Sequence, residues 1–310
     1  MASRQEVSAW RPQVAGVVEV LHARFTEHAY PMHVHDAWTL LIVDDGAVRY
    51  DLHRHRHGTP DDTVSLLPPH IPHNGSPATP RGFRKRVVYL DMTQLDEHFI
   101  GPAVDTPDLV DPLLRRRVGR LHTVLAHRGD ELEAESRLAL ISERLRMHLR
   151  PGAASGGATF GGGGAAFGRG GLDGGAAFGG GASLGYGPLG RGVAGDLRDL
   201  LDARLVEGLG LAEAARQLHA HPTHLVRAFT AAFGIAPHQY VVSRRVDLAR
   251  RRLLDGRPPH EVAPAAGFYD QSHLTRHFKR ILGTTPGRYA AAPPPRRPGN
   301  SAIRLNPSAP

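Results

Sequence analysis

The fold of this chain is decided by two related stretches near its C-terminus, THLVRAFTAAFGIAPHQY at 223–240 and SHLTRHFKRILGTTPGRY at 272–289. Six identical residues recur 49 positions apart: Leu225/Leu274, Arg227/Arg276, Phe229/Phe278, Gly234/Gly283, Pro237/Pro286 and Tyr240/Tyr289. The pairs His224/His273 and Thr223/Ser272 obey the same offset. So many matches at one spacing indicate an internal duplication. Two copies are too few for a solenoid, so the sequence predicts two similar small helical units.

The first copy has the pattern of a helix-turn-helix. Leu211–Leu218 predicts a short helix whose small alanines let a second helix pack closely against it. Residues 219–221 turn the chain, Pro222 opens the second helix and Gly234 ends it. That helix has an apolar inner side and presents three polar residues near its N-terminus: Thr223, His224 and Arg227. In this motif the N-terminal end of the second helix enters the major groove of DNA.

The second copy repeats the arrangement. Val262, Ala263 and Ala266 supply the packing helix, and Asp270 is placed to cap a helix over Gln271–Leu282. Its outward residues are predicted to read bases, because arginine pairs with guanine and glutamine with adenine; they are Gln271, Ser272, His273 and Arg276. Lys279 and Arg280 are predicted to meet phosphates. Pro264 departs from the pattern, since it should delete a hydrogen bond and kink the first helix.

The charge of the chain is concentrated in the duplicated region. The formal net charge is +8, and residues 193–297 hold 16 Lys or Arg against 9 Asp or Glu, a local excess of +7. A basic domain is the electrostatic pattern expected for a polyanion partner, because binding releases condensed counterions. An ordinary arginine-rich surface is the alternative, so the charge alone does not decide between the two.

The rest of the chain divides into segments of different pattern. Short apolar runs between about 14 and 92 are separated by turn signals and predict a sandwich or small barrel; the clearest are Trp38–Val43, Thr63–Leu67 and Arg86–Leu90. Between about 112 and 150 the spacing predicts two helices broken at 128–130, with one face on the β-domain and a second face free to meet another subunit. Residues 151–192 are mostly Gly and Ala, which predicts a flexible linker.

Composition narrows the class of protein. The chain has 310 residues, of which 41% are hydrophobic, so it has room for about two domains with real cores. It has no cysteine, which excludes disulfides and thiolate metal sites and favours a reducing, cytoplasmic location. The N-terminus has no secretory pattern and no run approaches about 18 apolar residues, so no membrane span is expected.

The duplicated region resembles the AraC-type (AraC/XylS) transcriptional regulators. The resemblance covers about 100 residues and rests on Leu225-x-Arg227-x-Phe229 and on the runs RRVDLARRRLL at 244–254, AGFYDQSHLTRHFKR at 266–280 and GTTPGRY at 283–289. It implies two helix-turn-helix units on a linker helix, set in successive major grooves on one face of DNA. The implied partners are a promoter site on double-stranded DNA, RNA polymerase and, in a homodimer, a second copy of the chain.

The N-terminal part is similar to the cupin-type sensor domain of the same family, on the runs PMHVHD at 31–36 and PPHIPHN at 68–74. His33 and His35 share one face of a strand, and with His73 they could bind a divalent metal. Thr39, however, stands where metal cupins place a glutamate, and the family's sensor domains often bind a small organic effector instead. The sequence therefore favours an effector pocket over a metal site or purely structural histidines; its predicted residues are His33, His35, Trp38 and His73.

The predicted fold class is α+β, with an N-terminal cupin-like β-barrel that carries a helical segment and a C-terminal all-α double helix-turn-helix. The expected segments are a sensor over 1–110, a helical dimerisation or packing segment over 111–150, a linker over 151–192, a DNA-binding domain over 193–292 and a disordered tail over 293–310. The predicted function is a one-component, effector-modulated transcription factor, not an enzyme, with no cofactor. A metal-dependent cupin enzyme and a DNA binder without sequence preference are the alternatives.

Overall fold

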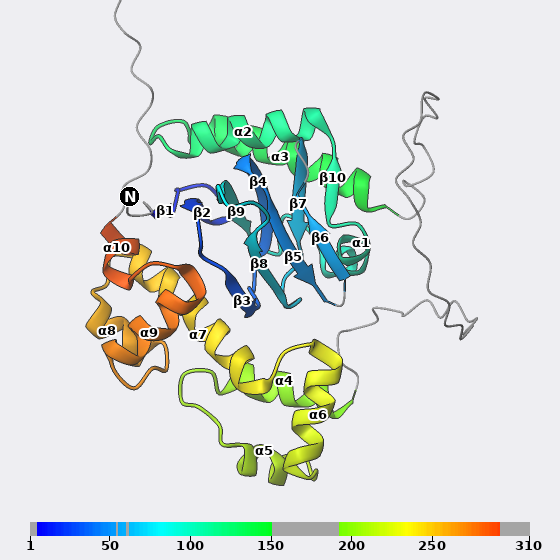
Figure 1. Cartoon of the computed structure of the whole chain (residues 1–310), viewed down its shortest axis with the longest axis vertical. Coiled ribbons are helices and arrows are strands. Elements are labelled where there is room, and N and C mark those ends of the chain that lie inside the picture. The colour runs from blue at the N-terminus through cyan, green and yellow to red at the C-terminus, as the bar shows by residue number, and fades with distance from the viewer. Residues whose placement is uncertain (1–4, 54, 60–61, 151–191, 292–310) are drawn as a thin grey trace, which may run out of the picture.

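The computed structural model describes residues 5–53, 55–59, 62–150 and 192–291 (Figure 1). Within these residues an N-terminal β-rich part carries two long helices, and the C-terminal part is all helical, which is the predicted α+β architecture. The predicted tail lies outside the described residues, and so does the predicted linker apart from Gly192. No helix in the described ranges has the length and hydropathy needed to span a membrane.

Six antiparallel strands form the larger sheet, and alternation along them gives it two apolar faces. The strand order is β1 (Glu6–Trp10), β2 (Val17–Phe25), β9 (Phe83–Leu90), β4 (Trp38–Gly46), β7 (Thr63–Leu67) and β10 (Asp108–Val110). The three apolar runs that predicted strands lie within β4, β7 and β9. On β4, Trp38, Leu40 and Ile42 belong to one core and Leu41 belongs to the other, as a period of two requires.

A second sheet completes the sandwich and supplies the strand ends that matter for function. Its four antiparallel strands, in order, are β3 (Tyr30–His33), β8 (His73–Pro77), β5 (Val48–Leu52) and β6 (His55–Gly58). Tyr30 and Val48 share a buried cluster with Leu21, Phe25 and Leu41 of the larger sheet, so the inner faces of the two sheets meet. His33 of β3 pairs with His73 of β8 in the ladder.

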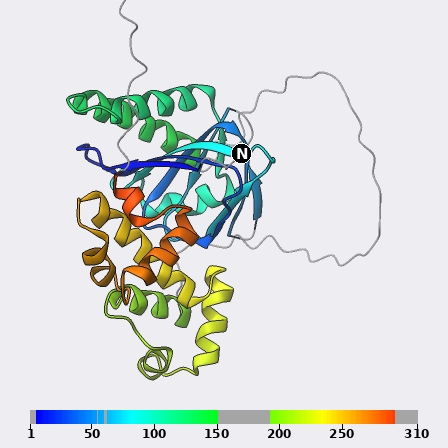
Figure 2. The same ribbon diagram turned by 60° about the vertical axis from the view of Figure 1, so that its left-hand side comes forward.

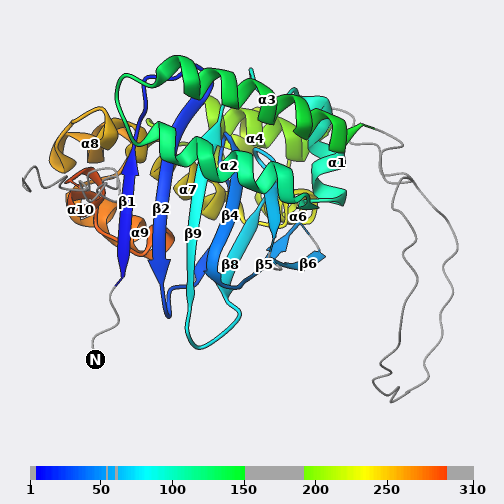
Figure 3. The same cartoon turned by 90° about the horizontal axis from the view of Figure 1, so that it is seen from above.

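Two antiparallel helices cover the opposite face of the larger sheet (Figure 3). They are α2 (Pro112–Leu125) and α3 (Glu131–Leu149), preceded by the short η1 (Glu97–Phe99) and α1 (Ile100–Asp105). Leu121, Ile141 and Leu145 are fully buried in the core that these helices share with the sheet. The predicted break between them is present, with Gly129 in the left-handed region at a φ of 93°.

The C-terminal part consists of two helical units joined by one long helix. The first unit contains α4 (Val193–Ala203), α5 (Leu211–Gln217) and α6 (Pro222–Phe233); the second contains α8 (Pro259–Ala265), α9 (Gln271–Leu282) and α10 (Pro286–Ala291). The helix α7 (Pro237–Leu254) joins them. Pro237 opens α7 at the position where its missing N–H costs no hydrogen bond.

The two parts of the molecule are docked on one another (Figure 2). A single buried cluster contains Phe25 and Tyr89 of the β-sandwich together with Ala249, Phe278 and Tyr289 of the helical part. The composition of residues 151–192 predicted a flexible linker, but the two parts on either side of it pack directly against one another. This contact was not visible in the sequence, because each of its apolar residues also fits the core of its own part.

Candidate functional site

The first helix-turn-helix is formed by α5 and α6. Leu225 and Phe229 of α6 are fully buried against α4. His221 caps α6, since its Nδ1 accepts from the Thr223 backbone N–H at 3.3 Å, and Gly234 ends the helix at a φ of 69°. This packing fixes which side of α6 faces outward.

The second helix-turn-helix is formed by α8 and α9. The Asp270 carboxylate caps α9 by accepting from the His273 backbone N–H at 2.7 Å. Pro264 lies in the last turn of α8, and α8 has seven residues, as α5 does. Val262 and Ala263 stay fully buried beside Pro264, so the predicted disturbance does not displace the helix from its core.

The two turns differ by one residue. The bond from Ala220 N–H to Ala215 O recurs 48 positions later, between Phe268 and Ala263. The first bond of the next helix, from Leu225 N–H to His221 O, recurs 49 positions later, between Leu274 and Asp270. The extra residue is Tyr269, which is 90% exposed. The turn before α9 is therefore one residue longer than the turn before α6, although the two helices have duplicated sequences.

Eight of the nine residues predicted to contact DNA are exposed on α6 and α9; they are Thr223, His224, Arg227, Gln271, Ser272, Arg276, Lys279 and Arg280. His273 is the exception, because its ring is half-buried in the turn. Its Nδ1 accepts from the Tyr269 backbone N–H at 3.3 Å, and its ring centroid lies 5.4 Å from that of Phe268 and 4.8 Å from that of His277. His273 therefore packs against the turn with part of its ring and keeps the rest of the ring accessible on the outer face of α9.

The three predicted sensor histidines lie together at the end of the sandwich that faces the helical part. His33 ends β3, His73 begins β8 and His35 follows β3 two residues later. Their ring centroids are 4.5–5.2 Å apart, and one nitrogen of each lies within 4.8 Å of the others. All three side chains are buried.

Each of the three rings is held by its Nδ1 atom. His33 Nδ1 lies 2.7 Å from Pro31 O, and His73 Nδ1 lies 3.0 Å from Ile71 O. His35 Nδ1 lies 2.8 Å from Asp247 Oδ1 of α7. Carbonyl and carboxylate oxygens only accept, so these contacts make each Nδ1 a donor. Arg250 Nη1, which also only donates, stands farther from His35 Nδ1, at 3.4 Å, so the shorter contact with Asp247 favours the proton on Nδ1. The Nε2 atoms, which keep their lone pairs, carry no hydrogen bond within the described part of the chain.

Burial favours the neutral form of His33 and His73. Burial, followed by the neighbouring His73 and His35, lowers the pKa of His33 well below its usual value. Burial, followed by His35, lowers the pKa of His73 to about 3. Asp247 behaves in the opposite way: burial alone would raise its pKa, but His35 and the arginines at 250 and 251 hold it well below the usual range. Asp247 is therefore held as a carboxylate anion beside the cluster.

Trp38 is not part of this cluster. It is fully buried in the other core, where its Nε1–H donates to Leu95 O at 2.8 Å. The next residue, Thr39, faces the opposite way, and its hydroxyl is buried with no hydrogen-bond partner among the described residues. The structure therefore brings together three of the four residues predicted to bind an effector.

The segment 31–36, which carries two of the histidines, also runs along the helical part. Met32 and Val34 pack into the core of the first helix-turn-helix unit, where Val34 is fully buried. Asp36 pairs with two arginines of α7, at 3.0 Å from Arg244 and 2.7 Å from Arg251. Alternate residues of one segment thus face the histidine cluster and the DNA-binding part.

A second buried group joins the sandwich to the other helix-turn-helix unit. Arg250 of α7 donates to Glu19 of β2 at 2.5 Å and to Asp247 at 3.0 Å. Tyr289 of α10 also donates to Glu19, and Arg250 lies over the ring of Tyr89, 4.3 Å from its centroid. Glu19 is 2% exposed and Arg250 is 3% exposed, so this ion pair is shielded from water.

These interface residues were missed by sequence reasoning. Asp247 and Arg250 lie in the linker-helix run that carried the family resemblance, but an arginine-rich helix alone predicts a solvated or DNA-facing surface. Glu19 lies between apolar residues in the first half of β2, and a carboxylate inside this apolar run was the available signal. Lys85 was missed in the same way: its ammonium stands 3.9 Å from the centroid of the Tyr30 ring, and burial, followed by Arg250, lowers its pKa to about 7.

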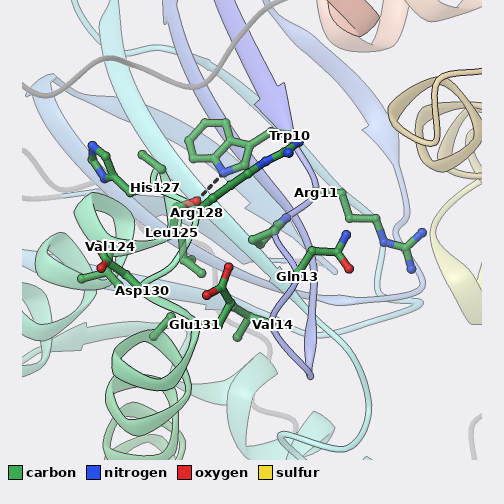
Figure 4. Close-up of a pocket in the computed structure, with 13 residues that line it drawn as sticks. Trp10, Arg11, Gln13, Val14, Val124, Leu125, His127, Arg128, Asp130 and Glu131 are labelled. Carbon is green, nitrogen blue, oxygen red and sulfur yellow. Dashed lines mark hydrogen bonds between the residues drawn. The ribbon is translucent and has the colours of Figure 1, made fainter.

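The cavities of the molecule differ in size and in position. The one that touches His35, Asp247 and Arg250 measures about 10 Å³. Larger cavities lie elsewhere: 340 Å³ beside Tyr30 and Asn74, 500 Å³ between β1–β2 and α10, and 150 Å³ between Trp10 and the α2–α3 turn (Figure 4). None of these three larger cavities is lined by a histidine of the cluster.

Comparison with protein families gives two matches. Residues 15–141 match the AraC-like ligand binding domain, and residues 214–292 match a helix-turn-helix domain. The probable transcriptional regulator LumQ of Photobacterium leiognathi is 31% identical over 90 residues, which cover 29% of this chain and 36% of that protein. The virulence regulon activator VirF of Yersinia enterocolitica is 29% identical over 93 residues, 30% of this chain and 34% of that protein. The matched part spans about a third of these relatives.

Among solved structures, ToxT of Vibrio cholerae has the same two-part architecture. One crystal form aligns with a TM-score of 0.51 over 94% of this chain and 98% of that one, at 10% identity. An apo variant of ToxT aligns with a TM-score of 0.54 at the same identity and coverage. At this identity the likeness shows the fold.

Proposed function

Because this chain belongs to the AraC-type transcriptional regulators and has both a ligand-binding domain and a helix-turn-helix domain, we propose that it binds a specific promoter site with α6 and α9. The observation that carries this proposal is the set of eight exposed polar and basic side chains on the outer faces of the two recognition helices. The matched relatives are transcriptional regulators, which favours this class over a metal-dependent enzyme.

The side chains suggest separate roles on DNA. Arg227 and Arg276 sit in the second turns of their helices and suit bidentate contacts with guanine. Gln271 is suited to form hydrogen bonds with adenine. The other residues proposed to contact bases near the N-termini of α6 and α9 are Thr223, His224, Ser272 and His273. Lys279 and Arg280 lie in the last turn of α9, where they suit contacts with phosphates. The first group would set sequence preference and the second would set overall affinity.

The sensor site of this regulator is the cluster of His33, His35 and His73. An effector bound there acts on DNA recognition through the segment 31–36, since this segment contacts α7 and the core of the first unit. Support comes from the position of α7, which joins the two helix-turn-helix units. A small shift of the segment changes how the two recognition helices are held relative to one another.

The remaining partners are a second copy of the chain and RNA polymerase. The homodimer is proposed to form through the outer face of α3, and the polymerase contact follows from activation at a promoter, the activity named for the relative VirF.

Capture of genomic DNA fragments by the full-length protein at physiological salt tests the proposal. A few enriched fragments, each with a footprint of about two helical turns, are the expected result. Equal retention of all fragments, with a steep salt dependence, would instead indicate a DNA binder without sequence preference.

A further inference from the structure

We propose that the effector of this regulator is a divalent transition-metal ion, held by the Nε2 atoms of His33, His35 and His73 and coupled to DNA binding by Asp247 of α7. This inference rests on the proposed function, because it names the ligand of the same sensor site. It departs from the expectation of an organic effector, and three independent features of the structure support it.

The first feature is the orientation of the rings. All three Nδ1–H groups are engaged by oxygen acceptors, so the three free lone pairs are on Nε2. A metal-ligating histidine usually donates its other N–H to a carbonyl or a carboxylate, which fixes its tautomer and its orientation. Two carbonyls and one carboxylate fill this role here.

The second feature is the size of the site. A zinc ion with Zn–N bonds of about 2.0–2.1 Å holds its nitrogens roughly 3.3 Å apart. One nitrogen of each ring lies within 4.8 Å of a nitrogen of the other two, so the rings have to close up to share one ion. The cavity of about 10 Å³ that touches His35 is lined by neither His33 nor His73, and none of the three larger cavities reaches the cluster. An organic effector commonly needs a pocket of about 300 Å³ or more.

The third feature is the source of the outer carboxylate. Asp247 belongs to the DNA-binding part, and it bridges His35 and Arg250 across the interface. An ion on His35 strengthens the hydrogen bond to Asp247, because coordination makes the ring N–H more acidic. The site is therefore fully assembled only when α7 is docked on the sandwich. By linkage, an ion that favours docking changes DNA affinity, and DNA changes ion affinity by the same factor.

The donor set indicates which ions fit. Three imidazoles suit zinc, nickel, copper and iron, whereas magnesium and calcium prefer oxygen ligands. Three protein ligands leave at least one coordination position open. The buried hydroxyl of Thr39, at the sequence position where metal cupins carry a glutamate, adds no charge to the site.

The test uses full-length protein without a histidine tag, stripped with EDTA and titrated with Zn²⁺ in competition with a chromophoric chelator. Wild type is expected to bind one Zn²⁺ per chain. Substitution with Co²⁺ is expected to give the visible d–d bands of a nitrogen-coordinated ion, a measurement that depends on no variant. His73→Asn should abolish the high-affinity site.

Asp247 acts as a positioning residue, and its test needs a matched control. Asp247→Asn is expected to weaken Zn²⁺ affinity by about 10–100-fold, as loss of an outer-shell partner usually does. Asp255→Asn is the control, because Asp255 caps the same helix and also pairs with the sandwich, at 2.9 Å from Arg11, but lies outside the cluster. Its Zn²⁺ affinity should equal that of wild type, and DNA footprints with and without Zn²⁺ should differ for it as they do for wild type.

Each outcome is decisive. No stoichiometric Zn²⁺ and no Co²⁺ bands would overturn the metal proposal, while sequence-specific DNA capture would still support the regulator. Tight Zn²⁺ binding with equal affinities for Asp247→Asn and Asp255→Asn would overturn the coupling through α7. Equal DNA affinity with and without Zn²⁺ would overturn the role of the ion as effector. Non-specific DNA capture would remove the proposed function whatever the metal result.

Discussion

Histidine is used in several ways in this chain, and the neighbours of each ring decide which. His221 caps a helix through its ring nitrogen, and His273 fills the turn before α9. His22 and His122 meet across the sandwich and α2, 3.2 Å apart, where burial, followed by Arg86, lowers the pKa of His22 to about 4. Only the group at 33, 35 and 73 combines burial, mutual proximity and three oriented Nδ1–H groups among the described residues.

The guanidinium groups on the recognition helices lead to a prediction for single residues. Arg227→Ala and Arg276→Ala should each weaken binding to the specific site by about 1–3 kcal/mol and relax the preference at one base pair. The measurement is binding to a set of single-base variants of the captured site. The control is Arg116→Ala, which changes an exposed arginine on α2 and should leave both the DNA affinity and the base preference unchanged. A uniform loss over all sequences would identify Arg227 or Arg276 as a phosphate contact.

At the scale of elements, Asp111 joins two helices of the sensor. Its carboxylate caps α2 by accepting from the backbone N–H groups of Leu113 and Leu114, each at 3.0 Å. It also accepts from Arg144, and His148 of α3 lies 2.7 Å away. Burial alone would raise the pKa of Asp111, but the hydrogen bonds from Arg144, His148 and Leu114 hold it well below its usual value.

Loss of the Asp111 charge should destabilise the sensor in a pH-dependent way. A lowered pKa in the folded state means that the stabilisation is complete above the ordinary carboxyl pKa of about 3.9 and declines as the pH falls below it. Asp111→Ala should cost about 1 kcal/mol for the cap alone. Asp111→Asn should remove the pH-dependent part. Urea unfolding followed by the fluorescence of Trp10 and Trp38, the two tryptophans of the chain, reports on the sensor.

The matched control is Glu135→Gln, because Glu135 is an exposed carboxylate on α3. This substitution should change the free energy of unfolding only slightly at every pH. If the gap between wild type and Asp111→Asn is the same at pH 3 as at pH 7, the charge of Asp111 contributes nothing.

The helix α3 carries an apolar face that turns away from the sheet. Leu132 is 78% exposed, Leu140 48% and Met147 45%, and their spacing of eight and seven residues places them on one side of the helix. We expect this face to form the predicted homodimer. Leu140→Glu should convert the dimer to a monomer in size-exclusion chromatography with light scattering, because it places a charge in the contact.

Leu211→Glu, which changes a leucine of similar exposure on α5, should leave the dimer intact. A wild-type protein that stays monomeric at every concentration would contradict the assignment of this face.

At the scale of the whole molecule, the sensor holds both helix-turn-helix units at once. The segment 31–36 contacts the first unit and α7, whereas Glu19 contacts α7 and Tyr289 of the second unit. Breaking a buried ion pair by removing one partner usually costs about 3–5 kcal/mol, because the other charge remains buried. The docked arrangement therefore depends on a small number of charged residues as well as on the shared apolar cluster.

Neutralisation of Glu19 should loosen the docking without unfolding either part. Glu19→Gln keeps an acceptor for Tyr289 but leaves Arg250 with one charge partner, Asp247, in place of two. The expected result is faster hydrogen exchange in α7, with no change in α5 and α6. The control is Arg11→Ala, which breaks the half-exposed ion pair with Asp255. Loss of this pair should reduce the stability of the docked arrangement by at most about 1 kcal/mol. Equal exchange in both variants would show that the buried pair does not hold the interface.

Local patterns were enough to predict much of the structure. The strands at 38–43, 63–67 and 86–90, the break at 128–130 and the two helix-turn-helix units were predicted from alternation, periodicity and turn residues. Pro264 was expected to disturb the second unit, but it lies in the last turn of a short helix, where one missing hydrogen bond is tolerated. The linker that the Gly/Ala composition predicted remains a prediction, because it lies outside the described residues.

The sensor site could be predicted only in part from local sequence patterns. Sequence alternation grouped His33 with His35, and His73 was predicted beside them. Trp38 was predicted at the same site, but its side chain faces the other core. His33 and His73 are oriented by carbonyl groups two residues away, but Asp247, which orients His35, lies more than 200 positions away along the chain.

The sequence by itself determined the elements, the duplication and the family, because each depends on residues that are neighbours along the chain. Only the tertiary structure decided that Asp247, Arg250 and Tyr289 meet His35 and Glu19. The physical reason is that a charged side chain has the same local pattern whether it faces water, DNA or a buried partner. Its environment is fixed only when the two parts dock and exclude water.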